Sequence, residues 1–401
     1  MLMKKRVCFL ADSVFTIGGV QRVTAVIAKA LATDYDVTIM TFDKPDAADL
    51  SLYGLDDNSL AIRFISYPKA GRIENALCKA YSALYLKLQL QSAWSSRLYG
   101  LSSFPPTLRK ALTRQLQDGR YDVIIGVHAP LAARLATIRK ELPGTRMIGW
   151  VHNSFEALYG KKYLYIGSLR RRHYIFQFRR LDRLVLLCRQ DVSAYTACDP
   201  QLSPTYIYNP LTLKPGPLAD GTSRRFLAIG RFSYQHKGFD LLIEAFHLFA
   251  QHDKVWSLDI VGEGPEEAAY RTLIGKYHLE DRVRIHPFTN DIQPYYSQAQ
   301  VYVLSSRWEG MPLVLVEAMS HGLPVVTSSL PVCQEILGDF AIYFNSGDVS
   351  SLSRRLNDAT NIDWPEKSRQ ALQIARQFQL DNIRPQWNAL INETSLTVKK
   401  V

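Results

Sequence analysis

The sequence contains few cysteines and no long apolar run. Five cysteines are scattered over 401 residues, without a Cys-x-x-Cys pair or a spacing typical of zinc ligands. This pattern excludes a disulfide framework and a structural zinc site, and it is typical of a reducing compartment. Apolar stretches of about eighteen residues, the length that a spanning helix needs, are also absent. We therefore expect a cytoplasmic protein without a membrane-spanning helix.

The N-terminal segment lacks the features of a signal peptide. Its apolar run is short, Asp12 interrupts it, and no cleavage site of small residues follows. Residues 6–12 are better interpreted as a first β-strand.

Acidic residues are scarce in the first half of the chain only. Residues 1–215 hold 30 Lys and Arg against 16 Asp and Glu (+14), residues 216–401 hold 18 against 21 (−3), and the sum is +11. The basic excess concentrates in residues 64–117 and 161–183, where aromatic residues are interleaved. This composition suits an anionic membrane surface, where each Lys or Arg adds about 1 kcal/mol of binding free energy. Nucleic acid would attract the same composition, and a solvated basic face is the remaining alternative.

Apolar runs of strand length alternate with helical patterns along the chain, and a segment rich in Pro and Gly, residues 209–223, divides them into two series. Continuous Val, Ile and Leu runs separated by helices predict parallel sheets that are buried on both faces. We therefore predict an α/β protein with two Rossmann-like domains, residues 1–210 and 211–377. The predicted strands are residues 6–12, 36–42, 122–128, 146–152, 183–188, 225–230, 256–262, 282–287, 301–306 and 324–328.

Glycine and basic residues follow several of these strands, at the sheet edge where ligands of parallel sheets bind. Gly18 and Gly19 make a tight turn onto a helix, which is a potential anion site, although Gly-x-Gly-x-x-Gly is absent. Arg231 and Lys237 follow the strand at 225–230 and could neutralise a diphosphate. Gly262 ends a further strand and would let the chain approach a ligand closely. Ordinary turn chemistry and solvated loop cations are the alternatives.

The segment 306–326 contains a short apolar helix with a glutamate before it and another inside it. Pro312 fits the first helical position, so the amides of Leu313 and Val314 would lack partners within the helix. Glu317 lies about 7.5 Å further along the helix axis, and Glu309 lies before the helix start. The two carboxylates would bracket an anion, as in a nucleotide-sugar. Alternatively, Glu309 is a loop charge and Glu317 pairs with a neighbouring base.

Four segments together resemble the retaining glycosyltransferases of family 4, which have the GT-B fold: residues 18–22, 230–238, 261–265 and 309–326. The last of them matches the family's E-x7-E element. The resemblance implies two Rossmann-like domains facing across a cleft. It also implies a C-terminal helix, within about 378–401, that crosses back onto the first domain.

The resemblance implies a role for each candidate residue. Glu317 would bind the donor ribose, and Glu309 would hold the donor sugar together with Gly310 and Met311. Phe288 and Thr289 would receive the base. The diphosphate would be bound by Arg231, Lys237, Leu313 and Val314, and its phosphate would also be approached by Gly18 and Gly19. His152 would contact the transferred sugar, and His128 is a second candidate for that contact. Asn209 would form the hinge between the domains.

Two segments depart from the family pattern. Thr289 stands where the family commonly has glycine, and residues 331–337 lack the usual Gly-Gly before the following glutamate. The resemblance further implies that neither a cofactor nor a divalent metal is required. The only Asp-x-Asp, at residues 34–36, directly precedes a strand, which favours a structural role.

These observations predict a retaining, metal-independent hexosyltransferase whose catalytic residues are His152, Arg231, Lys237 and Glu309. Its donor would be a nucleotide-diphospho-sugar, with UDP favoured by family habit. The basic first half points to a polyprenyl-diphosphate-linked or other lipid-anchored saccharide, extended at the inner face of a bacterial membrane during surface polysaccharide or lipopolysaccharide assembly. Nucleic acid is not an expected partner. A nucleotide-sugar epimerase of the same fold, a glycoside hydrolase and a basic nucleic-acid-binding protein are the alternatives.

Overall fold

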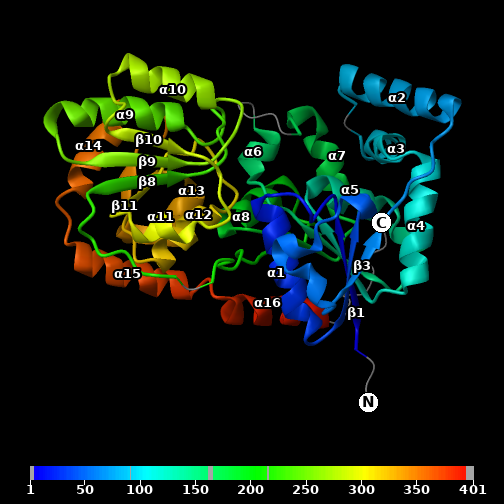
Figure 1. Cartoon of the computed structure of the whole chain (residues 1–401). Coiled ribbons are helices and arrows are strands. Elements are labelled where there is room, and N and C mark those ends of the chain that lie inside the picture. Colours follow the sequence, from blue (N-terminus) through cyan, green and yellow to red (C-terminus); the bar gives the residue numbers. More distant parts are fainter. Residues whose placement is uncertain (1–3, 91, 161–165, 215, 394–401) are drawn as a thin grey trace. The chain divides into compact units, whose positions relative to one another are not determined.

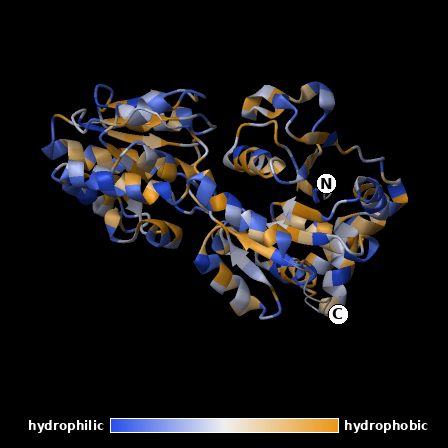
Figure 2. Ribbon diagram, turned by 90° about the horizontal axis from the view of Figure 1, so that it is seen from below, coloured by the Kyte–Doolittle hydropathy of each residue, from blue (hydrophilic) through white to orange (hydrophobic). Residues whose placement is uncertain are grey.

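The computed structural model of the protein describes residues 4–90, 92–160, 166–214 and 216–393. The chain forms two compact units, Met1–Asn209 with Leu380–Val401, and Pro210–Gln379. Each unit is built around one sheet whose strands all pair in parallel (Figure 1). Figure 2 shows hydrophobic residues concentrated on the strands of both sheets, where the cores lie.

The first unit contains a seven-stranded sheet in the order β3-β2-β1-β4-β5-β6-β7. Its central strands are buried along almost their whole length because helices cover both faces. The strands are β1 (Arg6–Ala11), β2 (Asp36–Thr41), β3 (Ala61–Phe64), β4 (Val123–Val127), β5 (Arg146–Trp150), β6 (Arg183–Leu186) and β7 (Pro204–Tyr206). The helices are α1 (Gly19–Ala32), α2 (Arg72–Lys87), α3 (Ala93–Ser103), α4 (Pro106–Gly119), α5 (Ala129–Thr137), α6 (Phe155–Tyr159), α7 (Ser168–Phe178), α8 (Arg189–Cys198) and α16 (Leu380–Asn392).

The second unit contains a six-stranded sheet in the order β10-β9-β8-β11-β12-β13. Its strands are β8 (Arg225–Ile229), β9 (Ser257–Val261), β10 (Val283–His286), β11 (Val301–Leu304), β12 (Val325–Ser328) and β13 (Ile342–Phe344). Its helices are α9 (Phe239–His252), α10 (Glu267–Lys276), α11 (Gln293–Ser297), α12 (Leu313–Ser320), α13 (Pro331–Leu337), α14 (Val349–Ala359) and α15 (Trp364–Arg376). Among all helices of the described residues, none has both the length and the hydropathy that crossing a bilayer requires.

The order of the strands places the loops that matter for function. In the second sheet β9 and β10 lie on one side of β8, and β11, β12 and β13 lie on the other side. The order in which successive strands join the sheet therefore reverses between β8 and β11. Ligands of open parallel sheets bind beyond the carboxyl ends of the strands at such a reversal. The loops at 230–238 and 305–312 follow β8 and β11, and therefore lie side by side at this point. In the first sheet the equivalent reversal lies between β1 and β4.

The structure confirms the predicted fold class and places a strand in each of the ten predicted segments. Three short strands escaped the sequence analysis, namely β3, β7 and β13. Each is only three or four residues long and lies at the edge of its sheet, where half-exposed positions interrupt the apolar run.

The C-terminal helix α16 belongs to the first unit, as the resemblance implied. Its Trp387 is fully buried and packs edge-to-face against Trp150 of β5, with ring centroids 4.8 Å apart. Polar contacts fix the same helix, because Arg384 and Asn388 both donate hydrogen bonds to the Asp34 carboxylate. The helix therefore completes the core of the first unit, although 173 residues separate it from β7 in sequence.

We predict that Trp387→Ala lowers the free energy of unfolding of the first unit by about 3–5 kcal/mol, because it leaves a large cavity beside Trp150. Urea denaturation followed by circular dichroism measures the change. Gln386→Ala, at the exposed neighbouring position of the same helix, is the matched control and should shift stability by less than about 0.5 kcal/mol. Equal effects of the two substitutions would contradict this account of α16.

Candidate functional site

The loop after β8 ends in a glycine that the fold requires. Gly238 has a positive φ of 65° and precedes α9. A Cβ atom at this position would lie 2.4 Å from the carbonyl oxygen of Ser305, so no larger residue fits without a backbone shift. The Ser305 hydroxyl donates a hydrogen bond of 2.8 Å to the carbonyl oxygen of Lys237. The loop after β8 is thereby held against the loop after β11.

Arg307 joins the same two loops from the other side. Its guanidinium group binds both carboxylate oxygens of Asp240 in α9, at 2.9 and 2.7 Å. Its backbone amide donates to the carbonyl oxygen of His236 at 2.7 Å. A two-pronged guanidinium–carboxylate contact fixes orientation as well as distance. The positions of Lys237 and Glu309, one on each loop, are therefore set relative to each other.

Lys237 and Glu309 form a buried ion pair. The Lys237 ammonium lies 2.7 Å from Oε1 of Glu309, and the Ser306 hydroxyl donates to the same oxygen at 2.6 Å. Nε2 of His236 lies 3.5 Å from the other carboxylate oxygen, and its ring stacks on Trp308 with centroids 3.9 Å apart. Burial by itself would raise the pKa of Glu309, but the charges of Lys237 and His236 hold that pKa below its ordinary value. Glu309 is therefore a carboxylate at neutral pH.

The sequence analysis missed this pairing. It assigned Lys237 to a diphosphate and Glu309 to a sugar, whereas in the structure the two side chains bind each other. Arg231, the second predicted diphosphate ligand, is exposed. The signal that could have revealed the pair is topological: the loops after β8 and β11 can touch only if these strands are neighbours in the sheet.

Helix α12 begins one residue later than predicted. Pro312 is the residue before the helix, with φ −76° and ψ 98°, and Leu313 is the first helical residue. The amide of Leu315 already bonds to the carbonyl of Pro312. The amides of Leu313 and Val314 still belong to the first turn of the helix, and amides of the first turn have no hydrogen-bond acceptor within the helix. The predicted pair of donors is therefore present at the predicted place, beside buried Gly310 and Met311.

Glu317 is buried inside α12, with 2% of its surface exposed. Its Oε2 accepts a hydrogen bond of 2.9 Å from the Tyr296 hydroxyl of α11. The alternative interpretation expected a neighbouring base as its partner, but this partner is a phenol. The ring of His321 stacks on Tyr296, and its Nδ1 lies 2.8 Å from the backbone carbonyl oxygen of Glu317. Glu317 thus belongs to a buried polar cluster on the helix that follows Glu309.

Gly262 lies close to protein backbone. A Cβ atom there would come within 2.0 Å of the carbonyl oxygen of Gly230, and one at Gly264 within 2.4 Å of that of Phe232. The amide of Phe232 bonds to the carbonyl of Glu263 at 2.7 Å. The close approach at Gly262 that the structure shows is between the loops after β8 and β9, and the predicted approach of a ligand stays a prediction.

The predicted base-binding residues follow β10. Phe288 is 37% exposed. The side chain of Thr289 is engaged in its own turn, since its Oγ1 accepts a hydrogen bond of 3.1 Å from the amide of Asp291. A hydroxyl that closes a local turn is less available to a ligand than the glycine backbone that the family commonly has here.

In the first unit, Gly18 and Gly19 lie at the start of α1. Gly18 precedes the helix, and its amide donates to the Tyr53 hydroxyl at 3.1 Å. Gly19 is the first helical residue and is exposed. The predicted glycine turn onto a helix is therefore present in the fold, but one of its amides is already bonded to a side chain.

His152 lies two residues after β5 and is 5% exposed. Its ring packs against Trp150, with centroids 4.3 Å apart, and edge-to-face against His128, at 5.3 Å. Within the described part of the chain, neither of its ring nitrogens has a hydrogen-bond partner. Burial, and then the proximity of His128, lower the pKa of His152 well below its ordinary value. The imidazole is therefore neutral at physiological pH.

The acidic pair at residues 34–36 holds the structure together. Asp34 accepts hydrogen bonds from α16, and Asp36 pairs with Arg6 at 3.2 Å. The described residues contain no group of three or more His, Cys, Asp or Glu side chains with the geometry to hold a metal ion. Asn209, the predicted hinge residue, is buried and is the last residue of the first unit before Pro210.

Comparison with known proteins identifies the class. Residues 17–210 match the family model of glycosyltransferase family 4, and residues 212–378 match that of the group 1 glycosyl transferases. The two models together cover most of the chain, so the chain belongs to these glycosyltransferases.

Individual relatives agree with this assignment over the whole length. The amylovoran biosynthesis glycosyltransferase AmsD of Erwinia amylovora is 25% identical over 96% of this chain and 99% of its own. The structure of S. aureus TarM with UDP has a TM-score of 0.75 at 13% identity and covers 97% of this chain and 100% of TarM. The structure of Anabaena HepE with UDP and glucose has a TM-score of 0.71 at 17% identity and covers 96% and 99%. Both structures show the same GT-B fold.

We predict that Lys237→Met destabilises the second unit by about 3–5 kcal/mol near pH 8, because it leaves a buried carboxylate without its cation. In the wild type the pKa of Glu309 is below its unfolded value, so this group causes no loss of stability between pH 5 and 8. In the variant, burial raises that pKa above the unfolded value, so stability should fall as pH rises through this window. Urea denaturation at several pH values measures the difference.

The matched control for this experiment is Arg231→Met, which removes an exposed cation from the same loop. It should change stability by less than about 0.5 kcal/mol at every pH. A pH-independent profile of Lys237→Met would show that the pair does not set the ionisation of Glu309.

Proposed function

We propose that this glycosyltransferase moves a hexose or N-acetylhexosamine from a UDP-sugar to a lipid-linked saccharide, with retention of the anomeric configuration and without a divalent metal. The observation that carries the proposal is the buried Lys237–Glu309 pair beside the first amides of α12. The pair combines a cation for phosphate and an ionised carboxylate for sugar hydroxyls at the reversal point of one sheet.

The leaving group explains why cations belong here. Transfer of a glycosyl group develops negative charge on the departing phosphate. Lys237 and the amides of Leu313 and Val314 are donors that the fold holds in place and that would stabilise such a charge, and Arg231 is an exposed cation of the same loop that would add to it. Because Lys237 is bound to Glu309 in this structure, an entering diphosphate would share or take over its ammonium group. These cationic groups make a metal unnecessary in the proposed reaction.

The ionised state of Glu309 excludes it as the proton donor of a glycoside hydrolase. A hydrolase needs one carboxyl group that stays protonated near neutral pH and donates a proton to the leaving oxygen. The pKa of Glu309 is shifted in the opposite direction. A permanent carboxylate is suited to accept hydrogen bonds from the hydroxyls of a donor sugar.

Retention needs no nucleophile from the chain in this proposal. The acceptor hydroxyl attacks on the face from which the nucleoside diphosphate departs, and the leaving phosphate takes its proton. Glu317 receives the ribose hydroxyls, and the neutral imidazole of His152 accepts or donates a hydrogen bond at the transferred sugar. These two roles rest on the family resemblance. The burial of His152 fits its role, because neither of its ring nitrogens has a hydrogen-bond partner in the described part of the chain, and an unsatisfied buried polar group is costly.

The acceptor proposal rests on the relatives and on charge. AmsD is named for the biosynthesis of the polysaccharide amylovoran. The +14 balance of residues 1–215 favours contact with anionic lipid. We therefore propose a polyprenyl-diphosphate-linked saccharide as the acceptor in bacterial surface polysaccharide biosynthesis, at the inner face of the cytoplasmic membrane.

We predict that a UDP-sugar raises the thermal unfolding temperature, because a ligand that binds only the folded state stabilises it. A thermal-shift screen with UDP-, GDP- and ADP-sugars tests this. The largest shift should come from a UDP-sugar, and a Lys237→Met protein should show a much smaller one. A larger shift with a GDP-sugar would overturn the choice of donor.

We predict that Glu309→Gln and Lys237→Met each lower transfer at least about a hundredfold while the protein stays folded, since each removes a fixed charge from the reacting site. Chromatography of radiolabelled lipid-linked product measures transfer, and circular dichroism checks the fold. Lys254→Met, an exposed lysine of the same unit, is the control and should transfer normally.

The same assay separates the alternatives. Full activity in EDTA and an unchanged anomeric configuration of the product are expected. Conversion of the UDP-sugar without any acceptor would instead indicate an epimerase, and cleavage of an oligosaccharide without nucleotide would indicate a hydrolase. Substantial transfer by Glu309→Gln would show that the site is wrongly assigned.

A further inference from the structure

Helix α2 is fixed on the first unit by one face only. Its Tyr81 hydroxyl donates to the carbonyl oxygen of Ser95 in α3 at 3.1 Å. The ring of Tyr85 is fully buried and stacks on Tyr99 with centroids 4.3 Å apart. Figure 1 shows α2 and α3 together at one end of the unit. These contacts define which face of α2 points inward, and therefore which side chains point outward.

One exposed face of α2, beside the face that packs on α3, is apolar. Ile73, Leu77, Leu84 and Leu88 are 77%, 67%, 46% and 58% exposed. At about 100° per residue, these four positions fall within about 60° of arc on the helix. We call them the apolar stripe. They make up four of the eleven large hydrophobic side chains exposed among the described residues. An amphipathic helix with its apolar side turned outward requires something to cover that side.

The stripe has a basic border. Arg72, Lys79 and Lys87 are exposed on the same helix. The one acidic residue of α2, Glu74, is turned toward α4, where its carboxylate accepts a hydrogen bond of 2.7 Å from the amide of Thr107. The only carboxylate of this helix is therefore engaged by α4 and not by the cations beside the stripe.

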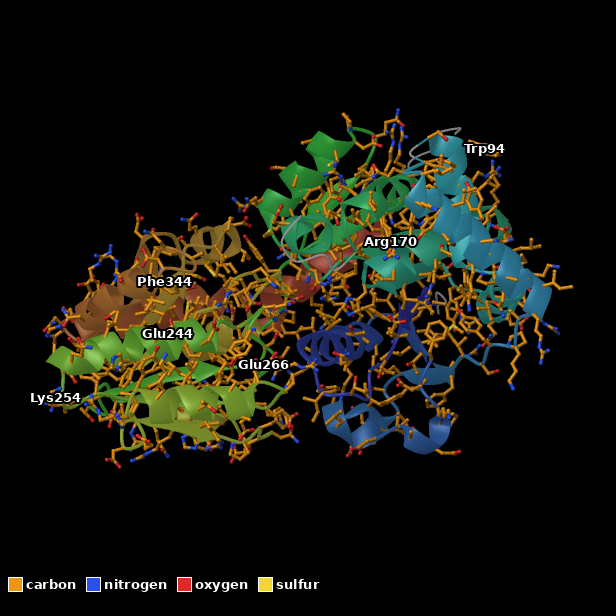
Figure 3. All side chains as sticks on the ribbon, turned by 90° about the horizontal axis from the view of Figure 1, so that it is seen from above. Trp94, Arg170, Glu244, Lys254, Glu266 and Phe344 are labelled. Carbon is orange, nitrogen blue, oxygen red and sulfur yellow. The ribbon has the colours of Figure 1, made fainter. Side chains whose placement is uncertain are left out.

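A tryptophan stands next to the end of the stripe in sequence. Trp94, at the start of α3, is 71% exposed, and Figure 3 shows it at the outer edge of the first unit. The other five tryptophans of the chain are buried or partly buried. Tryptophan prefers the headgroup level of a bilayer, where its ring lies in apolar surroundings and its N–H meets water.

From these observations we infer that the apolar stripe of α2, with Trp94, inserts into an anionic lipid bilayer at headgroup depth. The inference deepens the proposed function and rests on it for the lipid-linked acceptor. Charge complementarity selects the bilayer over a second copy of the chain, since two copies facing each other would oppose their basic borders. Apolar insertion and attraction of lysines to anionic lipid are the two terms of interfacial helix binding.

The second basic stretch contributes differently. Helix α7 buries Ile175 and Phe178 against the unit and exposes one large hydrophobic residue, Leu169. Lys161 and Lys162 of this stretch lie outside the described residues. The structure therefore assigns the inserting surface to α2 and α3, whereas residues 161–183 contribute only positive charge to lipid binding.

Sedimentation with vesicles tests the assignment. The whole protein is mixed with vesicles of phosphatidylcholine and phosphatidylglycerol, and the bound fraction is measured. The variant Leu77→Glu/Leu84→Glu should lose affinity at least about tenfold. The matched control is Leu218→Glu/Val255→Glu, which changes two residues of the second unit that are 55% and 56% exposed, and it should bind like the wild type. Brominated lipids should quench the fluorescence of the wild type, and Trp94→Phe should abolish most of that quenching.

The outcomes distinguish this surface from the proposed reaction. Wild-type vesicle binding by Leu77→Glu/Leu84→Glu would overturn the docking surface, whatever the donor screen gives. Loss of binding in that variant with an unchanged thermal shift by UDP-sugar supports it. Vesicle binding that depends on the stripe in a protein that binds no nucleotide-sugar would leave the surface standing and remove the proposed reaction. A solution dimer that the same variant separates would show that a second copy covers the stripe.

Discussion

The contact on which the second unit's chemistry depends is the ion pair between Lys237 and Glu309. Two charges can be buried at a sheet edge only because each compensates the other, and because Ser306 adds a hydrogen bond to the carboxylate. The surrounding loops are built to keep that geometry. Arg307 and Gly238 hold the loop after β8 against the loop after β11. A site that is already charged and rigid loses little energy by reorganising when a phosphate arrives.

The fold was largely predictable from the sequence because buried parallel strands leave long, continuous apolar runs. The start of helix α12 was predictable because Pro312 marks it, and only the role of Pro312 differed by one position. The predicted Rossmann-like order already makes β8 and β11 neighbours, although 71 residues separate the two strands. It does not give the side-chain contact between Lys237 and Glu309, which therefore was not predictable. Apolar patterns identify strands, but they do not give the order of strands within a sheet.

Glycine motifs show the same limit. Gly262 follows a strand and was expected to allow close approach, and Gly238, directly before α9, has the same role. The partner in each case is another loop of the protein, which a single sequence cannot name. The hydroxyl of Thr289 likewise binds its own turn. Such residues shape the site indirectly, by allowing neighbouring loops to pack closely enough for a few charged groups to meet.

The two units meet different physical requirements. The second unit concentrates charge at the carboxyl ends of its strands, which is what the proposed phosphate-containing donor would require, and its net charge is close to neutral. The first carries the basic excess, and its α2 exposes leucines that a water-soluble surface would normally replace by polar residues. Four aligned apolar side chains beside basic residues stay exposed, while other residues of α2 make its contacts with the unit. A surface of this kind gains free energy only when lipid or protein covers it. A lipid-linked acceptor is anchored in a bilayer, and a bilayer would also cover the exposed stripe. The proposed acceptor and the exposed stripe are therefore both explained by contact with lipid.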